Sequence, residues 1–144
     1  MPIQDQFESP DYYSLDELLT PEHLLIRKTI RDFVKKEITP IIEDVCQSCV
    51  FPKQLIPKLG DLGCFGPFIP NKYGGAELDQ ISYGLIMQEL ERGDSGIRST
   101  ASVQSSLVMF PIFQYGTNEQ KDKYLHKLAT GEIMGCFGLT EPNH

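Results

Sequence analysis

From residue 20 onward, apolar and charged positions follow the period of an α-helix. Thr20, Pro21 and Glu22 form a helix start, because Thr can cap the first amides, Pro tolerates the first helical position and Glu faces the positive end of the helix dipole. The apolar positions that follow at helical spacing are Ile26, Ile30, Phe33, Val34 and Ile38. The pattern predicts a helix whose solvated face carries Arg27, Arg31 and Lys35.

Proline and glycine divide the next part of the chain into shorter elements. Pro40 kinks or restarts the first helix, and the apolar stripe continues beyond it. Pro52 opens a short helix that Gly63 ends. Residues 64–80 contain further prolines and glycines, which predict a long ordered loop.

Helical spacing then resumes over residues 81–92. Asp94 or Ser95 caps the next predicted helix, over residues 95–109. That helix is rich in glycine, alanine and serine, so it can lie very close to a neighbouring helix or to a ligand. A capping box at Thr117 begins the last predicted helix.

The period of the pattern changes after Gly131, which closes that helix. Residues 133–139 combine a short apolar run with two glycines, and this predicts a β-strand. A single terminal strand has no partner in an otherwise helical chain, so we expect a fragment of a longer protein. The fold class predicted is all-α, with an N-terminal helical bundle over residues 1–131, an arm over 1–14, and the first strand of a truncated β domain in 132–144.

Composition and charge narrow the classes of function. The 144 residues are 40% hydrophobic, enough for one domain with a core. Thirteen basic residues against 20 acidic ones give a net charge of −7 with no basic block. This argues against binding nucleic acid but not against binding a charged metabolite. No apolar run approaches the roughly 20 residues of a transmembrane helix, and residues 1–10 resemble no signal or transit peptide, so we expect a cytoplasmic protein without a membrane partner.

Two of the four cysteines, Cys46 and Cys49, have the spacing of a redox motif or a zinc knuckle. A zinc site needs two further ligands, and no second pair of Cys or His follows at a suitable interval. A thioredoxin-like motif should follow a strand, whereas this one ends an apparent helix. The interpretation favoured is a pair of half-buried thiols on a helix, without a metal site or a disulfide.

The end of the chain resembles a known family. Residues Cys136 to Pro142 are similar to the flavin-contacting strand of acyl-CoA dehydrogenases, where such a strand runs into a Thr-Glu-Pro turn. The stretches Leu62–Gly75 and Tyr115–Glu132 resemble the family as well, and in the family's order. The resemblance covers residues 20–144 and implies a much longer catalytic chain, with a β domain and a C-terminal four-helix bundle.

Within that family, residues 91–99 most resemble glutaryl-CoA dehydrogenase, which oxidises and decarboxylates a dicarboxylic thioester. The distal carboxylate must leave water to enter a mostly apolar pocket, and this requires a fixed cation. Arg98 offers a planar fork of donors, Ser99 adds a hydroxyl, and Glu91 can orient the guanidinium. Spacing alone would make Arg98 a surface arginine, and Glu91 and Ser99 an exposed helix end and a packing residue.

The same resemblance implies that Phe137, Leu139 and Thr140 line the isoalloxazine ring of FAD, where spacing alone would give a buried strand and a turn. The family's catalytic base lies in its C-terminal bundle, so no catalytic residue is named in this chain. An electron-transferring flavoprotein as electron acceptor and a homotetrameric assembly are implied in the same way.

The sequence thus predicts the N-terminal part of an FAD-dependent enzyme for an acyl-CoA substrate, with conversion of glutaryl-CoA to crotonyl-CoA as the first choice. Two other classes stay open. One is a dehydrogenase or oxidase of the same family that acts on another thioester, and the other is a non-catalytic helical binding module.

Overall fold

The computed structural model describes residues 11–143, and within that range all regular structure is helical. A short 3-10 turn, η1 (Leu15–Leu18), precedes α1 (Pro21–Phe33), which continues as the π-helical segment η2 (Val34–Ile38). Then follow α2 (Ile42–Ser48), α3 (Leu55–Asp61), the 3-10 turn η3 (Asn71–Tyr73) and α4 (Gln80–Gly93). The remaining elements are α5 (Ser95–Ser102), the π-helical segment η4 (Val103–Met109), α6 (Phe110–Tyr115) and α7 (Asn118–Ala129). The predicted helical bundle is confirmed.

Capping side chains fix the starts of the main helices. The Oγ1 of Thr20 accepts a hydrogen bond from the His23 amide at 3.2 Å, and the Thr20 amide donates to the His23 ring Nδ1, which together form a capping box for α1. Thr117 caps α7 in the predicted way. The cap of α5 is Asp94, whose Oδ1 accepts from the amide of Ile97 at 2.8 Å, which decides between the two residues that the sequence offered.

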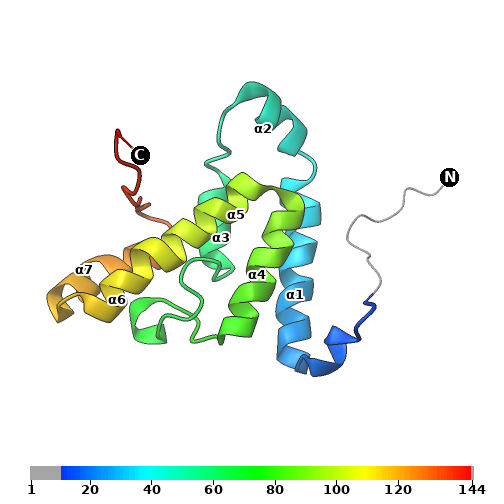
Figure 1. Ribbon diagram of the computed structural model, residues 1–144, viewed down its shortest axis with the longest axis horizontal. Helices are drawn as coiled ribbons and strands as arrows, with labels where there is room; N and C mark the ends of the chain where they lie inside the picture. Colours follow the sequence, from blue (N-terminus) through cyan, green and yellow to red (C-terminus); the bar gives the residue numbers. More distant parts are fainter. Residues whose placement is uncertain (1–10, 144) are drawn as a thin grey trace.

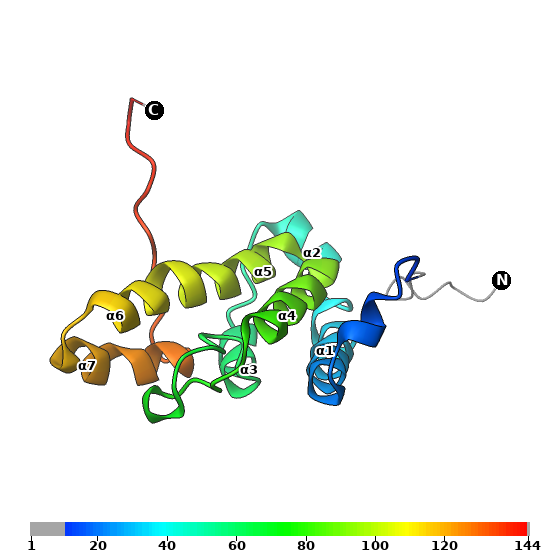
Figure 2. The same cartoon turned by 60° about the horizontal axis from the view of Figure 1, so that its bottom comes forward.

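Helices α1 and α4 lie side by side and form the centre of one half of the molecule (Figures 1 and 2). The predicted apolar face of α1 and η2 is confirmed, because Ile30, Val34 and Ile38 are buried. Gly93 permits the close approach at the end of α4, since a Cβ there would lie 2.6 Å from the Cγ1 of Val34. The fully buried side chains of α3, α4, α5 and α7 complete a single core: Leu55, Leu59, Ile86, Leu90, Ile97 and Leu125.

The helix predicted over residues 95–109 is longer than expected. Helices α5 and α6 and the segment η4 between them form one continuous rod that ends at Tyr115 (Figure 2). Proline usually ends a helix, but Pro111 is the second residue of α6, in the turn where the hydrogen-bond register changes back from π-helical to α-helical. Its missing amide therefore interrupts the backbone ladder at a point where the ladder is already irregular.

The strand predicted over residues 133–139 is wrong for the described part of the chain. These residues are extended, but no strand forms anywhere in 11–143, and the segment leads away from the helices (Figure 2). A strand needs a neighbouring strand to pair its amides and carbonyls, and this range offers none. The proposed division at residue 132 stays a prediction, and most of the arm predicted over 1–14 lies outside the described residues. No helix in 11–143 is long and apolar enough to cross a membrane.

Candidate functional site

The residues predicted to bind a substrate carboxylate lie where α4 ends and α5 begins. Asp94 joins the two helices, because its amide donates to the carbonyl of Leu90 at 2.9 Å while its side chain caps α5. This corner places Glu91, in the last turn of α4, beside Arg98 in α5. The Nε of Arg98 lies 2.6 Å from the Oε2 of Glu91, so the expected orienting contact between these two side chains is present.

Neighbouring hydroxyls complete this small network. The Oγ of Ser95 donates to the second carboxylate oxygen of Glu91 at 2.7 Å, and an Nη of Arg98 lies 3.4 Å from the Oγ of Ser102. The hydrogen bond from Arg98, and then that from Ser95, lower the pKa of Glu91. The Arg98 side chain is 33% exposed. Its guanidinium is therefore held at the Nε edge while part of the side chain faces solvent.

Ser99 lies on an adjacent side of α5, in the wall of an open groove of about 390 Å³ that we call the α5 groove. Its lining residues are Phe51, Ile56, Ser99, Thr100, Val103, Met134 and Gly135. Most of these are apolar, and a few polar groups among apolar ones are typical of small-molecule sites. Arg98 does not line the groove, so the structure places Arg98 and Ser99 on adjacent sides of the helix rather than in one pocket.

Gln104 ties the C-terminal segment to η4 beside this groove. Its side chain is fully buried, and its Nε2 donates to the carbonyls of Leu128 at 2.8 Å and Ile133 at 3.0 Å. Its Oε1 accepts from the amide of Gly135 at 2.9 Å. The backbone of Gly135 packs closely against Val108, since a Cβ added at 135 would lie 2.4 Å from the Cγ1 of Val108 and would have to displace that side chain. One side chain thus holds the end of α7 and the wall formed by Gly135.

The three residues predicted to contact the flavin lie further along this segment. Phe137 is 48% exposed and Leu139 is 75% exposed, and Thr140 is also exposed. The backbone between them is open, because a Cβ added at Gly138 would meet no atom within 4 Å. The buried strand that spacing alone suggested is therefore not formed by the described residues.

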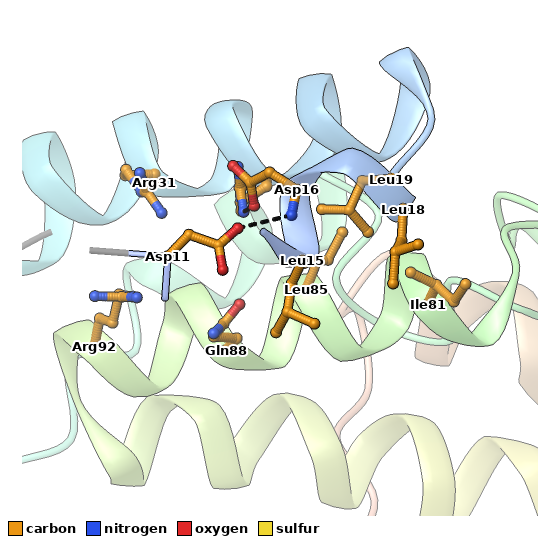
Figure 3. Close-up of a pocket in the computed structure, with 11 residues that line it drawn as sticks. Asp11, Leu15, Asp16, Leu18, Leu19, Arg31, Ile81, Leu85, Gln88 and Arg92 are labelled. Atoms are coloured by element: carbon orange, nitrogen blue, oxygen red, sulfur yellow. Dashed lines mark hydrogen bonds and ion pairs between the residues drawn. The ribbon is translucent and has the colours of Figure 1, made fainter. Parts of the chain in front are cut away.

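A second hollow, a cleft of about 520 Å³, lies between the N-terminal segment and helices α1 and α4 (Figure 3). Its lining residues are Asp11, Leu15, Asp16, Leu18, Leu19, Arg27, Arg31, Ile81, Leu85, Gln88 and Arg92. Figure 3 shows Asp11 and Asp16 between the two helices that carry Arg31 and Arg92. None of the predicted site residues lines this cleft.

The arginines of the cleft are paired with acids, which corrects the expectation that Arg27 and Arg31 lie on a solvated face of α1. The Nε and Nη2 of Arg31 each donate to Glu89 at 2.8 Å, and the Nε of Arg92 lies 3.6 Å from the same carboxylate. Arg27 binds Asp16 through two hydrogen bonds. Glu89 is fully buried, so α1 and α4 must supply positive charge around it.

Sequence reasoning missed Glu89 and Gln104, two of the buried polar residues. The helical period carried a signal for both. Glu89 follows the buried Ile86 by three positions in α4, and Gln104, in η4, follows the buried Ala101 of α5 by three positions. A polar residue at a core position of a helical pattern predicts a specific partner, because burying it unpaired is costly.

The cysteine pair at the end of α2 is exposed, not half-buried as the sequence suggested, and all four cysteines are free thiols. The reason is that α2 buries none of its residues. Within residues 11–143, no three His, Cys, Asp or Glu side chains gather closely enough to hold a metal ion.

Comparison with known proteins points to the same family as the sequence resemblance. Residues 20–132 match the family model of the acyl-CoA dehydrogenase N-terminal domain. The chain is 44% identical over 127 residues to a probable acyl-CoA dehydrogenase of Bacillus subtilis, and this alignment covers 87% of the chain and 33% of that relative. It is 36% identical over 126 residues to the mitochondrial short-chain specific acyl-CoA dehydrogenase of Bos taurus, with 88% of the chain and 31% of the relative covered. The chain thus spans about a third of the length of these relatives.

Solved structures of acyl-CoA dehydrogenases have the same fold as this chain. A glutaryl-CoA dehydrogenase from Mycobacterium smegmatis in complex with FADH2 superposes with a TM-score of 0.88 at 44% identity, over 92% of this chain and 34% of that one. The butyryl-CoA dehydrogenase of Megasphaera elsdenii gives 0.80 at 38% identity, over 87% and 33%. A chain from a structure of the electron transferring flavoprotein of Acidaminococcus fermentans gives 0.82 at 40% identity, over 86% and 33%.

Proposed function

The chain belongs to the acyl-CoA dehydrogenase family, whose N-terminal helical domain it contains, and we propose that the complete protein catalyses the FAD-dependent α,β-dehydrogenation of an acyl-CoA thioester. We propose further that its substrate is glutaryl-CoA, which is oxidised and decarboxylated to crotonyl-CoA. Bound FAD would supply the hydride acceptor for this reaction. The observation that carries the proposal is the pairing of Arg98 with Glu91 at the start of α5.

Arg98 would bind the distal carboxylate of the substrate. Glu91 holds only the Nε edge of the guanidinium at short distance, and the Nη contact to Ser102 is long at 3.4 Å, so the Nη groups can turn to a second carboxylate. The hydroxyl of Ser99, the next residue, lines the α5 groove, so it would hydrogen-bond a part of the substrate that lies in this groove rather than the carboxylate at Arg98. The likeness to a glutaryl-CoA dehydrogenase at 44% identity supports this choice of substrate.

The residues proposed to hold FAD suit a flat aromatic ring. Phe137 and Leu139 alternate along an extended backbone, both are exposed, and the backbone at Gly138 is open to a close approach. The amide and hydroxyl of Thr140 add polar groups beside them. Gln104 fixes the start of this segment through Ile133 and Gly135, so the segment leaves the helical domain from a defined point.

The same ion pair between Arg98 and Glu91 also allows a second substrate class. Arg98 already has a carboxylate partner in Glu91, and an arginine neutralised in this way needs no charge from the substrate. The complete protein would then act on an uncharged short acyl chain, as the names of the butyryl-CoA and short-chain relatives say of those proteins. In that case Arg98 only joins α4 to α5.

Substitution of Arg98 in the complete enzyme separates the two substrates. We expect Arg98→Ala to lower kcat/KM for glutaryl-CoA at least about 30-fold, which is a barrier higher by about 2–5 kcal/mol, because the charged hydrogen bonds between Arg98 and the substrate carboxylate are lost. Activity with butyryl-CoA should change little. Anaerobic bleaching of the flavin absorbance by each thioester measures both. Arg27→Ala is the matched control, since it removes an ion-paired arginine from a different helix. An equal loss with both thioesters would assign Arg98 a structural role.

The proposal extends to the partners of the complete protein. We propose an electron-transferring flavoprotein as the electron acceptor and a homotetramer as the assembly. The first is supported by the match to a chain in a structure of an electron transferring flavoprotein, and both accord with the family to which the chain belongs.

A further inference from the structure

The Cys46–Cys49 pair has no part in the proposed function. Cys46 lies in the last turn of α2 and Cys49 is the residue at which this helix ends. Both thiols are exposed and free. The Cα atoms of residues three apart in a helical turn lie about 5 Å apart, within the span of about 4.4–6.8 Å that a disulfide bridges. The Sγ of Cys49 lies 3.6 Å from the backbone carbonyl oxygen of Cys46, so this thiol is turned back toward the last turn of α2.

The backbone of Cys49 gives a second, independent observation. Its φ of 55° and ψ of 30° are left-handed, a conformation that costs a residue with a side chain about 1–2 kcal/mol. Helices that end in this conformation normally carry glycine or asparagine at that position. A cysteine at this position is therefore not explained by helix capping.

The surroundings of the pair allow a new covalent bond to form at little cost. Helix α2 buries none of its residues, and it stands apart from the other helices in Figure 1. A small rearrangement of its last turn therefore breaks no core packing. A disulfide that must shift its own backbone slightly to reach good geometry forms most readily in such a segment.

The other two cysteines lack at least one of the two features of this pair, which are exposure to solvent and a second cysteine nearby. Cys64 is fully buried, and burial raises the pKa of its thiol to about 12, so it presents almost no thiolate. Cys136 is exposed on the C-terminal segment and has no second cysteine near it in the sequence. They provide an inert thiol and a solitary exposed thiol as internal references.

We propose that Cys46 and Cys49 form a dithiol–disulfide site that low-molecular-weight disulfides, such as oxidised glutathione, oxidise. The thiolate of one cysteine attacks the S–S bond of the small disulfide, so that a mixed disulfide forms and one small thiol leaves. The thiolate of the other cysteine then attacks the protein sulfur of the mixed disulfide and releases the second small thiol. Two protein thiols and one small disulfide thus become one protein disulfide and two small thiols, which balances protons and electrons.

The test incubates the 144-residue chain in buffers of oxidised and reduced glutathione, traps the remaining thiols by alkylation and analyses the peptides by mass spectrometry. We expect the peptide with Cys46 and Cys49 to lose two hydrogens and to carry no glutathione, whereas Cys136 carries a glutathione adduct and Cys64 stays a thiol. Diluting both forms of glutathione about tenfold at a constant ratio should raise the disulfide-to-dithiol ratio about tenfold, because two small thiols are released. The adduct on Cys136 should not change.

Single substitutions show whether the second cysteine completes the reaction. In Cys46→Ser, Cys49 should accumulate a persistent glutathione adduct, and in Cys49→Ser the same should hold for Cys46. Both positions are exposed, so the far-UV circular dichroism should match that of the original chain. The proposal is overturned if the original chain carries lasting adducts on both cysteines, or if both stay thiols where Cys136 is modified.

Discussion

Replacing Gln104 by leucine tests whether a single side chain holds the C-terminal segment against η4. The substitution keeps a side chain of similar size but removes the two donated hydrogen bonds and the accepted one. The carbonyls of Leu128 and Ile133 and the amide of Gly135 all lose their partner. Because the side chain of Gln104 is fully buried, we do not expect a water molecule to take over its hydrogen bonds in Gln104→Leu.

The magnitude follows from the burial of the three groups that remain. A buried polar group left without a partner costs about 1–3 kcal/mol. The residue Leu128 is buried, but Ile133 and Gly135 are only partly buried and can turn toward water. The total cost should therefore be less than that of three buried groups without partners, and we expect the free energy of unfolding to drop by about 2–4 kcal/mol.

Urea unfolding of the 144-residue chain, followed by far-UV circular dichroism, measures this change. Hydrogen exchange of the Gly135 amide gives a local readout, because this amide should lose its protection even where the helices stay folded. Gln114→Leu is the matched control, since Gln114 is exposed in α6, and it should change stability by less than about 0.5 kcal/mol. A loss below about 1 kcal/mol in Gln104→Leu, or an unchanged exchange rate at Gly135, would refute the assignment of this anchor.

Three further predictions use the same chain. Glu89→Gln should lower the free energy of unfolding by about 3 kcal/mol or more in urea titrations, because it leaves Arg31 facing an uncharged partner in the core. The pKa of Asp79 is lowered from 3.8 to about 2, first by hydrogen bonds from Ser82 and then by His23. Its contribution to stability is therefore complete above the unfolded pKa and is lost as the pH falls from 3.8 toward 2. Unfolding curves across this window should show a smaller decrease in the free energy of unfolding for Asp79→Asn than for the original chain. Gly60→Ala should lower the melting temperature, because its Cβ would lie 2.4 Å from the carbonyl oxygen of Thr130, whereas Gly84→Ala, with no atom within 4 Å, should add about 0.5–1 kcal/mol of stability.

Local signals predicted the helices and their starts, since caps and apolar periods act within a few residues. Thr20 and Thr117 cap their helices in the predicted way. The prediction of a strand over residues 133–139 was wrong, because strand pairing depends on a partner that the local pattern does not contain. The continuation of the α5 rod past Pro111 was missed for a related reason, as local rules describe a regular α-helix and not a π-helical segment.

The site was predictable to the degree that its contacts are local. Glu91 and Arg98 are seven positions apart, and the resemblance of this stretch to a known family was enough to suggest their pairing. The anchor at Gln104 joins residues more than twenty positions away, and the Arg31–Glu89 pair joins two helices 58 positions apart. Such contacts follow from packing, and in the sequence they leave only a polar residue at a core position.

The geometry at Arg98 also limits how a substrate carboxylate could bind there. Glu91 occupies the Nε edge, so a second carboxylate must use the Nη groups, and it has to break only the long contact to Ser102. The planar fork of an arginine can serve two carboxylates on different edges at once. A lysine at this position has a single ammonium group that Glu91 would hold, so the positive charge alone is not sufficient. The choice between a dicarboxylic and an uncharged thioester therefore depends on whether the Nη edge of Arg98 receives a ligand, and Arg98→Ala tests this directly.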